Sequence, residues 1–236
     1  MQNKTEKIWC VVPAAGVGSR MQAGCPKQYL NLGKITILDA TLTRLLSSPK
    51  IEKIVVCINT DDAYWQHSIF VNHPKVTTTV GGEERSDTVL NGINRIKQYA
   101  SASDWLLVHD AARPCVTQKD IELLIDKAQS SQLGAILAAP IHDTVKKSDG
   151  ELSTETLDRS QLWRALTPQI FKLEELEVAL VAAKKSGKHI TDEASAIEHL
   201  NKAVQLVEGR ADNIKITTPA DLNLAKYYIA QQGDNK

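Results

Sequence analysis

The sequence has no excess of charge of either sign and no long apolar run. Among its 236 residues, 28 are Lys or Arg and 28 are Asp or Glu. General nucleic-acid and membrane-surface binders need a basic excess, so this balance argues against both classes. No uninterrupted apolar run approaches the roughly 20 residues that cross a bilayer, and residues 1–7 lack the apolar part of a signal peptide. We therefore expect a cytoplasmic protein.

Paired cysteines are also lacking. Cys10, Cys25, Cys57 and Cys115 are scattered without a C-x-x-C pair, which excludes a disulfide framework and a cysteine zinc site. Cys10 and Cys57 lie in apolar runs and are expected to be buried, whereas Cys25 is expected to be more exposed. We find no internal repeat, low-complexity segment or linker, so we expect a single domain over residues 1–236.

What the sequence does contain, near its start, is a glycine-rich segment with two cations. An apolar run over residues 8–12 is typical of a buried strand, and it ends at a proline. Glycines let backbone N–H groups come close to a bound anion, and an arginine and a lysine add positive charge. The segment therefore predicts a phosphate cradle, whose residues are Pro13, Ala14, Ala15, Gly16, Gly18, Gly24, Arg20 and Lys27.

Two common phosphate-binding motifs do not fit this segment. A P-loop has Gly-Lys-Ser/Thr, but Lys27 follows Pro26. A dinucleotide fingerprint has a third glycine where Met21 stands, which argues against a dehydrogenase. The remaining pattern, A-A-G-x-G-x-R followed by P-K, resembles the signature loop of nucleotidyltransferases that join a nucleoside triphosphate to a phosphorylated sugar or alcohol.

Apolar strands and amphipathic helices alternate along the chain. Strands are predicted at residues 8–12, 53–59, 76–80, 105–109, 134–139, 204–207 and 213–216. Helices are predicted at residues 37–46, 61–70, 83–99, 121–128, 172–186, from 191 onward, and 219–230. This alternation is typical of an α/β protein with a Rossmann-like, doubly wound and mostly parallel sheet, in which ligands bind beyond the carboxyl ends of the strands.

Charged residues and glycines follow three of the predicted strands. After the third strand, residues 81–88 offer two glycines and then charges at a helix N-terminus, which favours anionic ligands. Glu83 or Thr88 could equally well cap that helix. After the fourth strand, Asp110 could bind a ribose hydroxyl or a magnesium ion, or form a structural bond with Arg113. The neighbouring His109 is expected to be a packing residue.

Residues 141–162 are too polar for a core. They alternate polar and apolar residues around a Ser-Asp-Gly turn, which predicts a β-hairpin. Because an isolated hairpin leaves unpaired edges, we expect it to dock on a second subunit as a dimerisation arm. A flap over its own active site is the alternative.

Eight separated motifs together resemble one family. The motifs are PAAGVGSRM, PKQYL, GGEERSDTV, VHDAARP, DTVK, LTPQIF, TDEASAIE and VEGRADNIKIT. From about residue 8 to residue 228 the chain is similar to the 2-C-methyl-D-erythritol 4-phosphate cytidylyltransferases of non-mevalonate isoprenoid synthesis. The resemblance implies a nucleotide-diphospho-sugar transferase fold, a homodimer, and transfer of CMP from CTP to the methylerythritol phosphate with Mg²⁺ or another divalent cation.

The resemblance also implies a role for individual residues. The catalytic cations would be Arg20, Lys27, Arg159 and Lys215. The nucleotide would bind Pro13, Ala14, Ala15, Gly16, Gly18, Gly82, Glu83, Thr88, Asp110 and Ala111. The second substrate would bind Asp110, Arg113, Thr144, Arg159, Thr167 and Lys215, with Thr144 and Arg159 reaching in from the partner subunit. Family members commonly have Asp and Ser where this sequence has Glu83 and Thr88.

Two other functions remain open at this point. Ribitol 5-phosphate cytidylyltransferases share the loop and the sheet, and so would a module that binds CTP without turning it over. No His-based dyad is evident, which agrees with the implied chemistry, because a phosphate monoester is already anionic near neutral pH and needs no general base. Direct metal ligands are not predicted, apart from Asp110 as a candidate.

Overall fold

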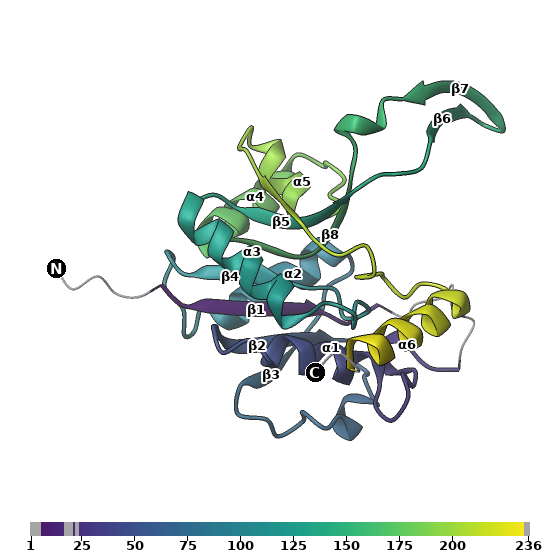
Figure 1. Cartoon of the computed structure of the whole chain (residues 1–236). Helices are drawn as coiled ribbons and strands as arrows, with labels where there is room; N and C mark the ends of the chain where they lie inside the picture. Colours follow the sequence, from purple (N-terminus) through teal and green to yellow (C-terminus); the bar gives the residue numbers. More distant parts are fainter. Residues whose placement is uncertain (1–5, 17–20, 22–23, 234–236) are drawn as a thin grey trace.

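The computed structural model describes residues 6–16, 21 and 24–233, and a seven-stranded sheet lies at its centre (Figure 1). The strand order is β3-β2-β1-β4-β8-β5-β9. The strands are β1 (Ile8–Pro13), β2 (Ile51–Ile58), β3 (Val76–Val80), β4 (Trp105–Val108), β5 (Ala135–Pro140), β8 (Trp163–Lys172) and β9 (Gln205–Glu208). Neighbours are parallel except at β8, which is antiparallel to both β4 and β5. The prediction of a mostly parallel α/β sheet is confirmed.

Helices cover both faces of this sheet. They are α1 (Ile37–Leu46), α2 (Arg85–Ile96), α3 (Gln118–Ser131), α4 (Leu173–Lys185) and α5 (Glu193–His199). Helix α6 (Pro219–Gly233) packs instead on α1 and the loop after β4 in a third apolar cluster. Helices α1 and α3 share one buried apolar cluster with alternate residues of β1, whereas α2, α4 and α5 share a second cluster with the other residues of β1. The sheet is thus doubly wound, as the alternation predicts.

Strand β1 is apolar throughout because both of its faces are buried. Cys10 and Val12 pack into the first cluster, and Trp9 and Val11 into the second. Cys10 is fully buried, as expected, and its burial raises the pKa of the thiol. Burial likewise raises the pKa of Cys57 to about 12, so neither thiol is a nucleophile at neutral pH.

Two predicted elements are wrong. The helix expected over residues 61–70 is only the short 3-10 helix η3 (Trp65–His67), because the Asp62 carboxylate accepts the N–H groups of Tyr64 and Trp65 and fixes a turn there. The second is the strand expected over residues 213–216, which have no regular secondary structure. Their backbone groups instead bond to side chains and loops of the site described below.

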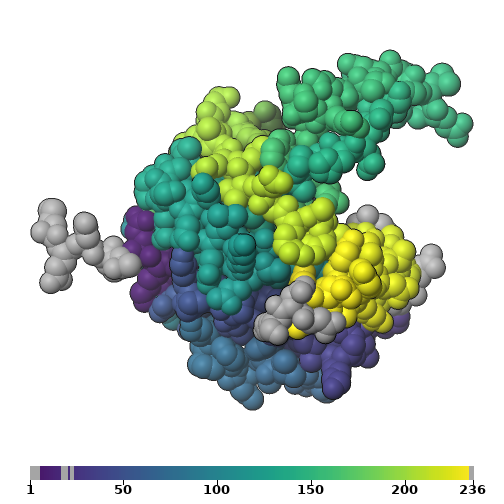
Figure 2. Space-filling view, viewed as in Figure 1, coloured from purple at the N-terminus to yellow at the C-terminus, as the bar shows by residue number. Residues whose placement is uncertain are grey.

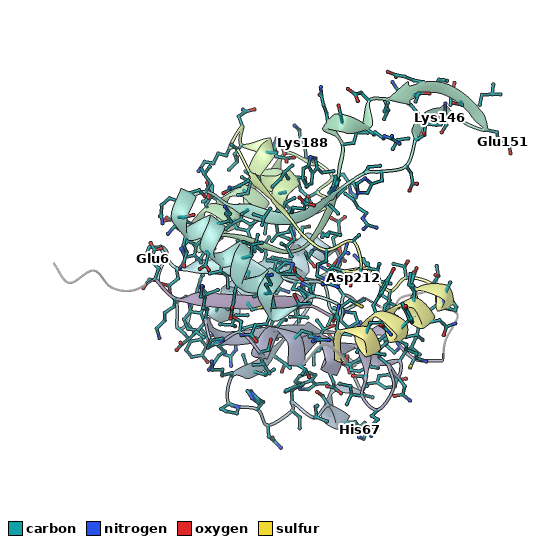
Figure 3. The ribbon with its side chains drawn as sticks, viewed as in Figure 1. Glu6, His67, Lys146, Glu151, Lys188 and Asp212 are labelled. Carbon is teal, nitrogen blue, oxygen red and sulfur yellow. The ribbon has the colours of Figure 1, made fainter. Side chains whose placement is uncertain are left out.

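The predicted hairpin is confirmed. Strands β6 (Val145–Asp149) and β7 (Leu152–Leu157) pair only with each other, antiparallel, around a turn in which Gly150 has a φ of +56°. The hairpin stands clear of the body (Figure 2), with Lys146 and Glu151 far from the sheet (Figure 3). Leu152 is 75% exposed. An exposed apolar residue on an unpaired hairpin suits docking, but the dimerisation role of residues 141–162 stays a prediction.

None of the helices in the described parts of the chain combines the length and the apolar character needed to cross a bilayer.

Candidate active site

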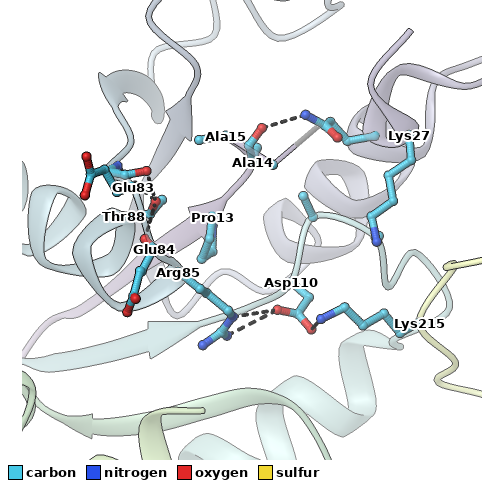
Figure 4. A pocket seen from close by; sticks show the side chains of 15 residues that line it. Pro13, Ala14, Ala15, Lys27, Glu83, Glu84, Arg85, Thr88, Asp110 and Lys215 are labelled. Atoms are coloured by element: carbon cyan, nitrogen blue, oxygen red, sulfur yellow. Dashed lines mark hydrogen bonds and ion pairs between the residues drawn. The ribbon is translucent and has the colours of Figure 1, made fainter. Parts of the chain in front are cut away.

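A cavity of about 230 Å³ lies beyond the carboxyl ends of β1, β3 and β4 (Figure 4). The predicted nucleotide-binding residues that line it are Pro13, Ala14, Ala15, Gly16, Gly82, Glu83, Thr88, Asp110 and Ala111. Lys27 and Lys215 line it as well. Gly18 and Arg20 lie outside the described residues. Segments that are far apart in the sequence therefore meet at one edge of the sheet. This agrees with the expectation that ligands of a doubly wound sheet bind beyond the carboxyl ends of its strands.

Gly81 and Gly82 allow close approach at this edge. A Cβ at Gly81 would lie 2.4 Å from the Cβ of Ala15, and a Cβ at Gly82 would lie 2.3 Å from the Cβ of Asp87. The loops after β1 and β3 can therefore touch only because residue 81 has no side chain. Gly16 and Gly24 differ, since neither has a positive φ, and a Cβ there would meet no atom of the described residues within 4 Å. At Gly16, which lines the cavity, the lack of a side chain leaves the cavity open.

Thr88 holds the loop at Gly82 in place. Its hydroxyl accepts the Gly82 N–H at 3.0 Å and donates to the Glu84 carbonyl at 3.0 Å, and the residue is only 4% exposed. Neither Thr88 nor Glu83 caps α2: the N-cap residue is Glu84, without a side-chain cap bond. Thr88 therefore contributes to the site by shaping the Gly82 backbone.

Asp110 is the centre of a cluster of charges. Its Oδ1 accepts from Arg85 Nη2 at 3.2 Å, and its Oδ2 accepts from Lys215 Nζ at 2.9 Å and from Arg113 Nε at 3.4 Å. Asp110 is 7% exposed. Burial by itself raises the pKa of this carboxyl, but Arg85, Lys215 and Arg113 together hold the pKa well below its usual range. Asp110 is thus an anion surrounded by three cations, and the alternative of a bond to Arg113 is realised as one part of this cluster.

A second cavity, of about 220 Å³, lies on the other side of the charge cluster. Arg85, Asp110 and Lys215 line both cavities. The predicted second-substrate residues that line this one are Asp110, Arg113, Thr167 and Lys215. The charge cluster is therefore the wall between two adjoining spaces, each large enough for part of a ligand.

Thr144 and Arg159 line neither cavity. Arg159 begins the 3-10 helix η4 (Arg159–Gln161) at the base of the hairpin, where its guanidinium donates to the His142 carbonyl. Both residues are exposed. Within one chain they do not meet the second-substrate residues, so their predicted contribution requires a partner subunit and stays a prediction.

Residues 213–216 hold the two lysines at the cavity. The Asn213 carbonyl accepts from Arg113 Nη1 at 2.8 Å, and the Ile216 N–H donates to the Ala112 carbonyl at 2.8 Å. The Ile216 carbonyl accepts from Lys27 Nζ at 3.1 Å. These bonds fix Lys215, which lies between the two anchored residues, against Asp110.

The model of one protein family, 2-C-methyl-D-erythritol 4-phosphate cytidylyltransferase, matches residues 8–231. The chain belongs to this family. A relative from Tolumonas auensis with that name is 51% identical over 223 residues, which are 94% of this chain and 96% of the relative. A Vibrio vulnificus relative of the same name is 46% identical over the full length of both chains. The crystal structure of the Francisella tularensis 2-C-methyl-D-erythritol 4-phosphate cytidylyltransferase is similar with a TM-score of 0.83 at 37% identity, covering 94% of this chain and all of the other.

The resemblance to the cytidylyltransferase family implies Mg²⁺ or another divalent cation at this site, with Asp110 as the candidate ligand. Among the residues that the structure describes, no three His, Cys, Asp or Glu side chains gather as a metal site. Asp110 is the one predicted candidate, and both of its oxygens already accept from cations. The described side chains therefore do not fit a metal held by the protein itself.

His109 is a packing residue in this cytidylyltransferase, as expected, and it also fixes Thr167. His109 Nε2 lies 3.0 Å from the Arg113 carbonyl, which can only accept, so Nε2 carries the hydrogen. Nδ1 then accepts from the Thr167 hydroxyl at 3.0 Å, and the Thr167 oxygen accepts the Asp110 N–H at 3.1 Å. The Thr167 hydroxyl hydrogen is thus already used, and Thr167 can donate to a substrate phosphate only by leaving His109.

We expect His109 to make the protein less stable in mild acid. Its full burial lowers the folded-state pKa from 6.5 to about 4. Between these values the unfolded chain takes up a proton that the folded chain does not, so stability is fully present above pH 6.5 and falls as the pH decreases. The slope is at most about 1.4 kcal/mol per pH unit. Urea unfolding from pH 4 to 7.5 measures it, and His109→Gln should lose this part of the slope; equal slopes in both proteins would contradict the assignment.

Sequence reasoning missed three residues of this cytidylyltransferase site. Gln28 donates to the Ala14 carbonyl at 2.6 Å and so supports the loop after β1. Arg85, on α2, is one of the charges at residues 81–88 for which the sequence predicts no individual role. Glu193, on α5, looks in the sequence like an ordinary acidic residue of a first helical turn, yet it is 1% exposed and bonded to Arg85.

Proposed function

We propose that this chain transfers CMP from CTP to 2-C-methyl-D-erythritol 4-phosphate and releases pyrophosphate. The family match and the names of its relatives supply the two substrates. The observation that carries the proposal is the charge cluster at Asp110, which separates two adjoining cavities and presents Lys215 to both. Two anionic substrates must be brought together for this reaction, and a cationic wall between two cavities is suited to that task.

The chemistry follows from these parts. CTP would occupy the cavity beside Lys27, with its base toward Gly82, and the tetritol phosphate would occupy the second cavity beside Arg113. A phosphate oxygen of the tetritol attacks the α-phosphorus of CTP in line, the bond to the β-phosphate oxygen breaks, and pyrophosphate leaves. Lys27 and Lys215, with Arg20, would neutralise the negative charge that accumulates and hold the two phosphates in line. A divalent cation would arrive with the CTP phosphates.

The experiment that tests this function is pyrophosphate release in the presence of Mg²⁺. CTP is compared with ATP, GTP and UTP, and 2-C-methyl-D-erythritol 4-phosphate with ribitol 5-phosphate. Release only with CTP and the methylerythritol phosphate is the expected result. Release with ribitol 5-phosphate alone would overturn the acceptor, and CTP binding without release in any pairing would indicate a non-catalytic module.

A homodimer built on residues 141–162 is part of the proposal. The exposed hairpin and the position of Thr144 and Arg159 outside both cavities support it. Light scattering at micromolar concentration should give twice the 26.0 kDa chain mass. A monomer at that concentration would count against the arm as an interface. A cytoplasmic location is likewise proposed, from the sequence.

Replacing Arg159 with alanine should mainly weaken the use of the tetritol phosphate. Loss of one charge-assisted hydrogen bond, about 1.5 to 3 kcal/mol, corresponds to a roughly 10- to 100-fold higher KM for that substrate. The KM for CTP should change little. Steady-state kinetics with each substrate varied in turn measures both values, and Lys147→Ala, which removes an exposed cation of the same hairpin, is the control. An equal rise in both KM values would contradict the assignment.

A further inference from the structure

Glu193 is a buried carboxylate that belongs to neither cavity. It is 1% exposed, and it forms a two-pronged ion pair with Arg85: Oε1 lies 2.6 Å from Nη1 and Oε2 lies 3.0 Å from Nη2. Neither cavity is lined by Glu193. Burying a carboxylate is costly unless it is paired and hydrogen-bonded. A packed apolar residue would avoid that cost, so the position of Glu193 requires another explanation than packing.

The start of α5 holds Glu193 firmly. The neighbouring Ala194 N–H donates to Gln169 Oε1 at 2.9 Å, and Gln169 Nε2 donates to Asp192 Oδ2 at 2.9 Å. Asp192 and Ser195 form a capping box at the first turn of α5. Gln169 lies on β8, so the segment that carries Glu193 is anchored to the central sheet on both sides of it, through the Ala194 N–H and through the Asp192 side chain.

Arg85 connects this anchor to the site. While its Nη1 and Nη2 atoms bond to Glu193, its Nε and Nη2 atoms donate to Asp110 Oδ1 at 3.3 and 3.2 Å. The planar guanidinium is thus held by carboxylates along two of its edges, which fixes its orientation. Asp110 Oδ1 is occupied by Arg85, and Oδ2 is left to Lys215 and Arg113.

Glu193 also sets the charge of the cluster. Burial raises the pKa of the Glu193 carboxyl, and the Arg85 guanidinium opposes that rise. With both carboxyls ionised, Arg85, Arg113 and Lys215 carry three positive charges against the two negative charges of Asp110 and Glu193, which leaves one positive charge. Without the carboxylate of Glu193 the same cluster would carry two, and Arg85 would be free to turn from Asp110 toward a substrate phosphate. Low-dielectric surroundings make such a change larger than at the surface.

We propose that Glu193 is a positioning residue for the transfer reaction, acting through Arg85 on the orientation of Asp110 between the two cavities. The inference rests on the proposed function and adds to it a residue that touches no substrate. Because small displacements at a reacting centre lower turnover strongly, we expect Glu193→Gln to lower kcat about 10- to 100-fold. CTP affinity, measured by calorimetry, should stay within about threefold, since Lys27 and the loops after β1 and β3 are unchanged.

Four further variants separate positioning from a general loss of structure. Glu193→Asp keeps the charge and should recover part of the activity. Glu177→Gln breaks an exposed ion pair between α4 and α2, with Lys97, and is the matched control that should leave kcat unchanged. If Glu193 acts through Arg85, the double variant Arg85→Gln/Glu193→Gln should be no slower than Arg85→Gln alone.

The outcomes are distinct. A kcat within twofold of wild type for Glu193→Gln, or multiplied losses in the double variant, would overturn the proposal. If Glu193→Gln fails to fold, the kcat values of Glu193→Asp and Arg85→Lys are compared with that of the wild type instead. A normal kcat in both variants would overturn the positioning role of Glu193. A wild-type protein that releases pyrophosphate with no substrate pair would instead refute the proposed function, so the two failures are distinguishable.

Discussion

Lys27→Ala is expected to lower kcat by at least 10²- to 10³-fold, about 3 to 4 kcal/mol of transition-state stabilisation. Lys27 lines the first cavity, and its Nζ is held by the Ile216 carbonyl at 3.1 Å. The ammonium group is therefore already in place before a triphosphate binds, which is the condition under which a cation stabilises developing charge most effectively. Pyrophosphate release at saturating concentrations of both substrates measures the effect.

Lys34→Ala is the control for this variant, because Lys34 is an exposed cation seven residues further along the chain. Its kcat should equal that of the wild type. Near-normal turnover in Lys27→Ala would remove Lys27 from the charge-stabilising role. Arg20→Ala should have an effect of the same size if Arg20 shares that role, although Arg20 lies outside the described residues.

Asp110→Asn is expected to destabilise the fold by about 3 to 5 kcal/mol, because removing one partner of a buried ion pair leaves the other charges uncompensated. Here the change leaves Arg85, Arg113 and Lys215 around a neutral amide, and the Glu193 carboxylate, which pairs with Arg85, offsets one of the three charges. The asparagine nitrogen can also only donate, so one of the cations loses its acceptor. Urea unfolding at pH 7 measures the loss, and turnover should fall in the same variant.

Asp126→Asn provides the comparison. Asp126 also pairs with a cation, Lys50, but its side chain is 62% exposed, so the change should have little effect on stability. Equal unfolding free energies for Asp110→Asn and the wild type would show that the three cations do not depend on the carboxylate. The cluster would then be a solvated group of charges with no structural role.

Much of the fold could be predicted because local signals and packing agree. The helix over residues 37–46 has an apolar face, and Thr36 accepts the Asp39 N–H as its N-cap, so the predicted and observed bounds coincide. Where one side chain competes with the helix, the prediction fails: Asp62 holds the backbone around Tyr64 in a turn, and Tyr29 bonds to the same carboxylate from another part of the chain. Such a contact between distant residues leaves no periodic signal.

The site could be predicted in part for a similar reason. Asp110, Lys27 and the glycines were found because the ends of parallel strands meet at one edge, so their convergence follows from the order of elements. Glu193 could not be found in this way. Its partner Arg85 is 108 residues away, and the burial of its carboxylate depends on how α5 packs on β8. A search for acidic residues in the first turns of the predicted helices would have included Glu193, on α5, without identifying its partner.

The position of residues 213–216 bears on when a newly made chain can become active. Every strand of the sheet ends by Glu208, so the ribosome has synthesised the whole sheet before Asn213, Lys215 and Ile216 are added. Domains begin to fold during synthesis from the N-terminal side. Since residues 213–216 belong to no strand, the sheet can form first, while Lys27 still lacks the Ile216 carbonyl and Asp110 still lacks Lys215. Catalytic competence would thus be acquired after the core has formed.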